Sequence, residues 1–118
     1  MAHIPYYRHA MKRLMRTIME SLHTGDLLPE LYANSILLPE EYEMVDREGT
    51  YRGSTSQAKL LLDIMLKKET KYIESFVWVL QKSGEMEHSG HKIIADMIMD
   101  TAQKMWSGEI RTDFTTKS

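Results

Sequence analysis

The side chains best suited to metal chemistry are two histidines, His88 and His91, which are separated by Ser-Gly. On a helix, this spacing brings two imidazoles to one face, and paired imidazoles are frequent zinc ligands. Zinc needs further ligands, and no carboxylate near this pair in the sequence supplies a convincing third one in an open site. We therefore expect no metal ion and no other cofactor.

The hydroxyl run Ser54-Thr55-Ser56 is the second stretch that could bind a ligand, because hydroxyls near a basic residue can contact phosphate. It lacks the Gly-Lys-Ser/Thr ending of a phosphate-binding loop. The chain has no cysteine, which excludes disulfides, thiolate zinc sites and cysteine nucleophiles. No spacing assembles a nucleophile, a base and an orienting acid, so we expect no catalytic residues and no enzyme.

Charge is segregated along the 118 residues, although the formal net charge is only −2. Residues 1–24 carry four basic side chains and one acidic one, whereas residues 25–48 carry seven acidic side chains and one basic one. The overall balance argues against a generic nucleic-acid binder. The separation of signs indicates instead two surfaces of opposite charge.

Residues 58–67, Ala-Lys-Leu-Leu-Leu-Asp-Ile-Met-Leu-Lys, form the most apolar helical stretch. On a helix, apolar side chains cover most of its circumference, while Lys59, Asp63 and Lys67 share one narrow stripe. Such a helix must be covered on several sides, so we place it in the middle of a bundle. Asp63 can pair with either lysine at a spacing of four residues.

Apolar periodicity predicts six helices with short connections, which is an all-α antiparallel bundle. The first runs from near Pro5 to Gly25, and Asp26 caps a second that ends at Asn34. The third extends from Pro39 to Gly49, and Ser54 with Gln57 forms a capping box for the fourth. Thr70 caps the fifth, Ser89 caps the sixth, and the loops cover residues 49–53 and 83–88.

One domain accounts for residues 1–106, and residues 107–118 are expected to be a flexible tail or the start of a linker. The longest apolar runs fall far short of the roughly 18 residues that a membrane span needs. Pro5, Arg8 and His9 stand where a signal peptide requires an apolar stretch. We therefore expect a cytoplasmic protein.

Three short patterns resemble the caspase recruitment domain of the death-fold superfamily. They are Ile-Leu-x-x-Glu-Glu-Tyr-Glu at 36–43, Lys-x-Leu-Leu-Asp-Ile at 59–64, and Phe-x-x-x-Leu-x-x-x-Gly at 76–84. The resemblance covers roughly residues 8–102. It implies six helices in Greek-key topology and no chemistry of the domain's own.

This resemblance implies homotypic binding, in which such domains assemble adaptor platforms or filaments in apoptotic or innate-immune signalling. A basic patch on the first and fourth helices of one copy would meet an acidic patch on the second and third helices of the next. The basic residues would be Arg8, Lys12, Arg13, Arg16, Lys59 and Lys67, and the acidic residues Asp26, Glu30, Glu40, Glu41, Glu43 and Asp46. Partners would be another caspase recruitment domain and copies of this chain.

Affinity also needs an apolar anchor, and Trp78 is the candidate because its helix face is otherwise charged. The alternative for Trp78 is burial under the C-terminal tail, and the alternative for both patches is plain solvation. Two other functions remain open. One is nucleic-acid binding through the basic residues, and the other is a different death-fold subfamily whose members cap and block assembly.

Overall fold

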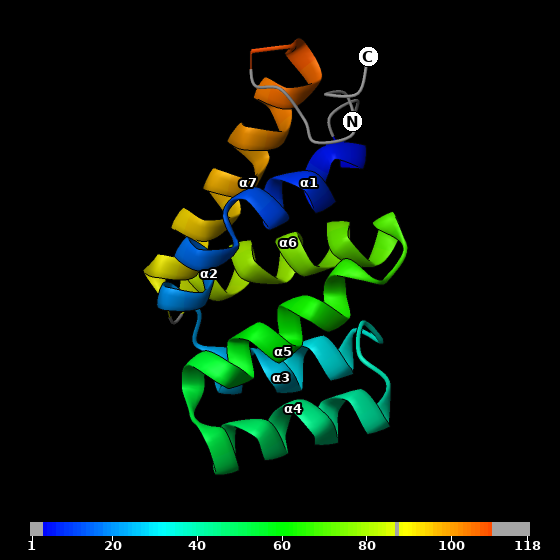
Figure 1. The fold of residues 1–118 in the computed structure, drawn as a ribbon, viewed down its shortest axis with the longest axis vertical. Coiled ribbons are helices and arrows are strands. Elements are labelled where there is room, and N and C mark those ends of the chain that lie inside the picture. Colours follow the sequence, from blue (N-terminus) through cyan, green and yellow to red (C-terminus); the bar gives the residue numbers. More distant parts are fainter. Residues whose placement is uncertain (1–3, 87, 110–118) are drawn as a thin grey trace.

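The computed structural model describes residues 4–86 and 88–109, and within them the chain forms one short 3-10 helix and seven α-helices without any strand. They are η1 (Ile4–Tyr6), α1 (Tyr7–Arg13), α2 (Met15–Ser21), α3 (Thr24–Ala33), α4 (Pro39–Arg52), α5 (Ser54–Leu66), α6 (Thr70–Met86) and α7 (Ser89–Ser107). The predicted all-α bundle is confirmed. In Figure 1, α3, α4 and α5 lie toward one end of the long axis, and α1 and the C-terminal part of α7 lie at the other.

Helix α5 occupies the middle of the bundle, as its apolar sequence predicts. It packs against α1, α2, α3, α4 and α6, and Leu61, Leu62 and Met65 are fully buried. The narrow polar stripe stays at the surface, where Lys59 Nζ lies 2.9 Å from Asp63 Oδ2. The pairing partner of Asp63 is therefore Lys59.

The first predicted helix is bent into two shorter ones, α1 and α2, at Leu14. Hydrogen bonds continue across the bend, because the Leu14 N–H donates to Ala10 O and the Leu14 carbonyl accepts from Ile18 N–H. Met11 and Ile18, one on each side of the bend, are both buried. The chain then turns at the extended residue Leu22, so Gly25 lies inside α3 and does not end the first helix as predicted.

The predicted loop at residues 49–53 is wrong, because α4 continues to Arg52. Gly49 is a contact point within the helix: a Cβ there would lie 2.3 Å from Gln57 Nε2. Gln57 is buried and donates from Nε2 to Val45 O at 3.1 Å, which ties α5 to α4. The helix ends instead at Gly53, whose φ of +96° favours glycine.

Helix α6 also runs further than predicted, to Met86, and therefore occupies most of the expected 83–88 loop. It forms the most extensive helix pair with α7, and Phe76, Leu80 and Ile98 are buried in the core. Helix α7 ends at Ser107, with Gly108 left-handed at its C-cap. The rest of the predicted tail, residues 110–118, lies outside the described residues. None of the described helices combines the length and the apolarity that a bilayer crossing requires.

Candidate functional site

Five of the six predicted basic residues are exposed. Lys12 and Arg13 belong to the last turn of α1, Arg16 to α2, Lys59 to α5, and Lys67 caps the C-terminus of α5. Helices α1 and α2 both pack against α5, so these cations come from neighbouring elements. We call Lys12, Arg13, Arg16, Lys59 and Lys67 the basic surface.

Arg8, the sixth predicted basic residue, is engaged inside the domain. Its Nε donates to Leu66 O at 3.1 Å and its Nη2 donates to Lys68 O. These carbonyls belong to the end of α5 and the turn after it, where helix geometry leaves carbonyl groups without an intrahelical partner. Arg8 thus joins the start of α1 to the end of α5 and positions Lys67 beside α1.

Replacing Arg8 with methionine is expected to lower the free energy of unfolding by about 1–2 kcal/mol, because two carbonyl acceptors lose a charged donor while the aliphatic stem is kept. The matched control is Arg13→Met on the exposed side of the same helix, where a change within about 0.5 kcal/mol is expected. Urea unfolding followed by circular dichroism measures both. Equal stability of the two variants would contradict a capping role for Arg8.

The predicted acidic residues lie on two adjacent helices. Asp26 and Glu30 are exposed one turn apart on α3, and Glu40, Glu43 and Asp46 are exposed on α4. Helices α3 and α4 pack against each other. We call Asp26, Glu30, Glu40, Glu43 and Asp46 the acidic surface.

Glu41, the remaining predicted acid, is half-buried and has structural partners. Its Oε1 accepts from Leu38 N–H at 2.9 Å, which caps the first turn of α4. The same oxygen lies 2.7 Å from Lys68 Nζ, in the most buried ion pair among the described lysines. Arg8 and Glu41 thus both bind Lys68: Arg8 donates to its backbone carbonyl, and Glu41 accepts from its ammonium group.

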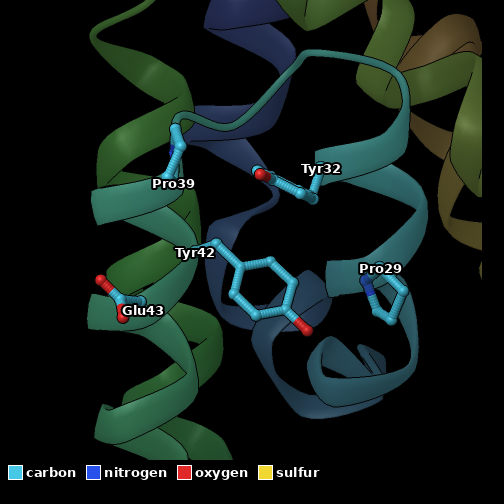
Figure 2. A pocket seen from close by; sticks show the side chains of 5 residues that line it. All are labelled: Pro29, Tyr32, Pro39, Tyr42 and Glu43. Atoms are coloured by element: carbon cyan, nitrogen blue, oxygen red, sulfur yellow. The ribbon is translucent and has the colours of Figure 1, made fainter.

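An aromatic hollow opens on the acidic side between α3 and α4. It has a volume of about 520 Å³ and is lined by Pro29, Tyr32, Pro39, Tyr42 and Glu43. Figure 2 shows the two tyrosine rings extending between the helices, with the Glu43 carboxylate turned away from them. The rings meet edge to face, with centroids 5.4 Å apart. Helical periodicity predicts that Tyr42 faces the core, but it does not predict the contact with Tyr32. That contact forms only when α3 and α4 pack against each other.

Trp78 is half-exposed, and α6 brings it to the acidic side. It lines a hollow of about 160 Å³ together with Asp26, Glu30, Lys82 and Met86. The Lys82 ammonium lies 5.7 Å from the centre of the indole ring, within the range of a cation–π contact. The proposed anchor and the α3 carboxylates therefore form one continuous region.

The two histidines of the 88–91 pattern meet a third histidine and a carboxylate from α3. His88 Nε2 lies 2.7 Å from Asp26 Oδ2, and its ring stacks on His23 with centroids 4.3 Å apart. His91 is fully buried, with Nε2 accepting from His23 N–H and Nδ1 facing Ser83 Oγ, each at 2.9 Å. A search for ligands near His88 in the sequence misses Asp26, which is 62 residues away.

Burial is the main reason that the pKa of His91 falls to about 4, and the nearby imidazoles of His88 and His23 lower it further. Asp26 acts in the opposite direction. His91 is therefore neutral at physiological pH. Because Nε2 accepts the His23 N–H, the proton sits on Nδ1 and is donated to Ser83.

Comparison with models of known families matches residues 8–92 to the model described as Caspase recruitment domain. No curated protein and no solved structure matches the chain. The matched segment runs from α1 into the first turn of α7 and covers more than half of the chain. Domains of this family are protein-interaction modules that bind other domains of the death fold. The chain belongs to the caspase recruitment domain family.

Proposed function

We propose that this domain binds another caspase recruitment domain, and copies of itself, head to tail through its basic and acidic surfaces. Such binding would assemble an adaptor platform or filament in apoptotic or innate-immune signalling. The observation that carries the proposal is where the charges of the two surfaces lie: the cations of the basic surface are on α1, on α2 and on α5 and its C-cap, and the carboxylates of the acidic surface are on α3 and α4.

Two different surfaces that attract each other favour a heterologous contact. Each copy that binds through one surface leaves the other free, so the contact repeats unless the rotation closes a ring. In Figure 1, α4, which carries most of the acidic surface, and α1, which carries Lys12 and Arg13, lie toward opposite ends of the long axis. Concentration-dependent assembly is the expected behaviour.

Charge alone mainly raises the association rate and rejects wrong partners, so the contact also needs apolar anchors. The acidic side offers two of them, the Tyr32–Tyr42 hollow and Trp78. The long aliphatic stem of an arginine or lysine can lie along an aromatic ring while its head meets a carboxylate. This chemistry supports a cationic side chain of the partner as the group received by the acidic surface.

The test is charge reversal on one surface at a time, with Arg16→Glu on the basic surface and Glu43→Arg on the acidic surface. Each variant is expected to weaken self-association at least about 100-fold, because like charges then face each other across the contact. Both residues are exposed, so the helical spectrum and the thermal midpoint should stay close to wild type. Sedimentation velocity over a concentration series gives the association constant.

Mixing the two variants provides the decisive readout. Each retains one intact surface, so the mixture should form at least a one-to-one complex, which neither variant forms alone at the same concentration. Lys92→Glu and Asp96→Arg on the exposed face of α7 are the matched controls and should assemble like wild type. If Arg16→Glu and Glu43→Arg each assembled like wild type, the two-surface proposal would be wrong.

A further inference from the structure

His23, Asp26 and His88 bring three metal-ligating groups together from two distant parts of the chain. His23 precedes the first residue of α3, Asp26 lies in the first turn of that helix, and His88 precedes α7. Their ligand atoms all lie within 4.8 Å of one another. His23 and Asp26 are exposed and His88 is half-buried, so an ion from solvent can reach all three.

The arrangement is held in place by His91 behind it. His91 Nε2 accepts the backbone N–H of His23, and Nδ1 is hydrogen-bonded to Ser83 on α6. Both ring nitrogens of His91 are thus occupied, which leaves the three outer side chains as the ligand set. The buried imidazole fixes the backbone from which His23 projects, in the way that outer-shell groups support metal ligands.

We propose that His23, Asp26 and His88 bind a zinc ion, with water completing the coordination. Two imidazoles and one carboxylate are ligands that zinc accepts, and three protein ligands with one open position is a known zinc arrangement. Tetrahedral zinc with bonds of about 2.0–2.1 Å places its ligand atoms roughly 3.4 Å apart. His88 Nε2 and Asp26 Oδ2 lie 2.7 Å apart, closer than this, so these side chains must rotate apart to admit the ion.

The rings of His23 and His88 stack nearly parallel, with an interplanar angle of 11°, so one ring must rotate before the lone pairs of both imidazoles point at the same ion. The partial positive charge at the N-termini of α3 and α7 opposes a cation, whereas Asp26 favours it. We therefore expect micromolar affinity, below that of a closed four-ligand structural site.

The experiment uses the full chain without an affinity tag, stripped with EDTA and then dialysed free of chelator. Isothermal titration with zinc chloride should give one site per chain, and cobalt(II) should show the intense visible absorption of a tetrahedral ion. Zinc should also raise the thermal midpoint, because it binds the folded state. No binding up to millimolar zinc would overturn the proposal.

Two ligand variants and one control locate the site. His88→Gln and Asp26→Asn should each weaken zinc binding at least about tenfold and reduce the thermal shift at a given zinc concentration. His9→Gln, which changes a histidine of α1 outside the cluster, should bind zinc like wild type. Wild-type affinity in His88→Gln would overturn the proposal, and circular dichroism without zinc confirms that each variant is folded.

Discussion

Replacing Gly84 with alanine is expected to lower the free energy of unfolding by about 2 kcal/mol or more, the cost of overfilling a packed interface. A Cβ on Gly84 would lie 2.3 Å from the backbone nitrogen of Lys92 and 2.5 Å from its Cβ. Backbone cannot move aside as the end of a flexible side chain can. The end of α6 and the first turn of α7 would therefore have to move apart. Urea unfolding followed by circular dichroism measures the loss.

Gly90→Ala is the matched control, because it adds the same methyl group to α7 close to this contact. Nothing lies within 4 Å of a Cβ built on Gly90. Alanine restricts the unfolded chain and favours a helix, so a change between zero and a gain of about 1 kcal/mol is expected. If Gly84→Ala proved as stable as Gly90→Ala, the spacing of α6 and α7 would not depend on Gly84.

Replacing His91 with leucine is expected to lower the free energy of unfolding by about 3 kcal/mol, because leucine fills the space but makes neither hydrogen bond. The His23 N–H then loses its acceptor in a partly buried position, and the Ser83 hydroxyl loses its donor. The same two contacts join α3, α6 and α7. Chemical unfolding at pH 7 measures the change, with EDTA present so that bound metal does not contribute.

Ser83→Ala separates the two hydrogen bonds of His91. It removes the partner of Nδ1 and leaves the His23 contact in place, so a loss of about 1 kcal/mol is expected. A loss in His91→Leu no larger than in Ser83→Ala would mean that the His23 contact adds little. That result would contradict the role assigned to His91 in holding the start of α3.

The sequence predicts which residues face the core better than it predicts where helices end. Leu61, Leu62 and Met65 follow from apolar periodicity, which depends only on neighbouring residues. Gly49 and Gly84 look like helix ends, yet both lie inside helices where another segment approaches closely. No glycine or proline near Leu14 indicates the bend in the sequence. Each of these features depends on packing between segments.

The candidate surfaces show the same division. The exposure of charged residues such as Arg16 and Glu43 can be predicted, because they lie on the helix face opposite the apolar residues. Arg8 and Glu41 have the same chemistry, but tertiary hydrogen bonds engage them, and sequence reasoning placed both on the surfaces. The aromatic hollow and the histidine cluster were missed because their members come from different helices.

The 3-10 helix η1 packs against α7, so the described chain starts and finishes at one end of the bundle, away from α4. A domain tethered before η1 and another tethered after α7 would therefore be attached close together. In a regular stack of copies, each copy presents the same attachment point, so neighbouring attachment points are separated by the same distance throughout the stack. Such a stack would hold the tethered domains at a constant spacing along its length.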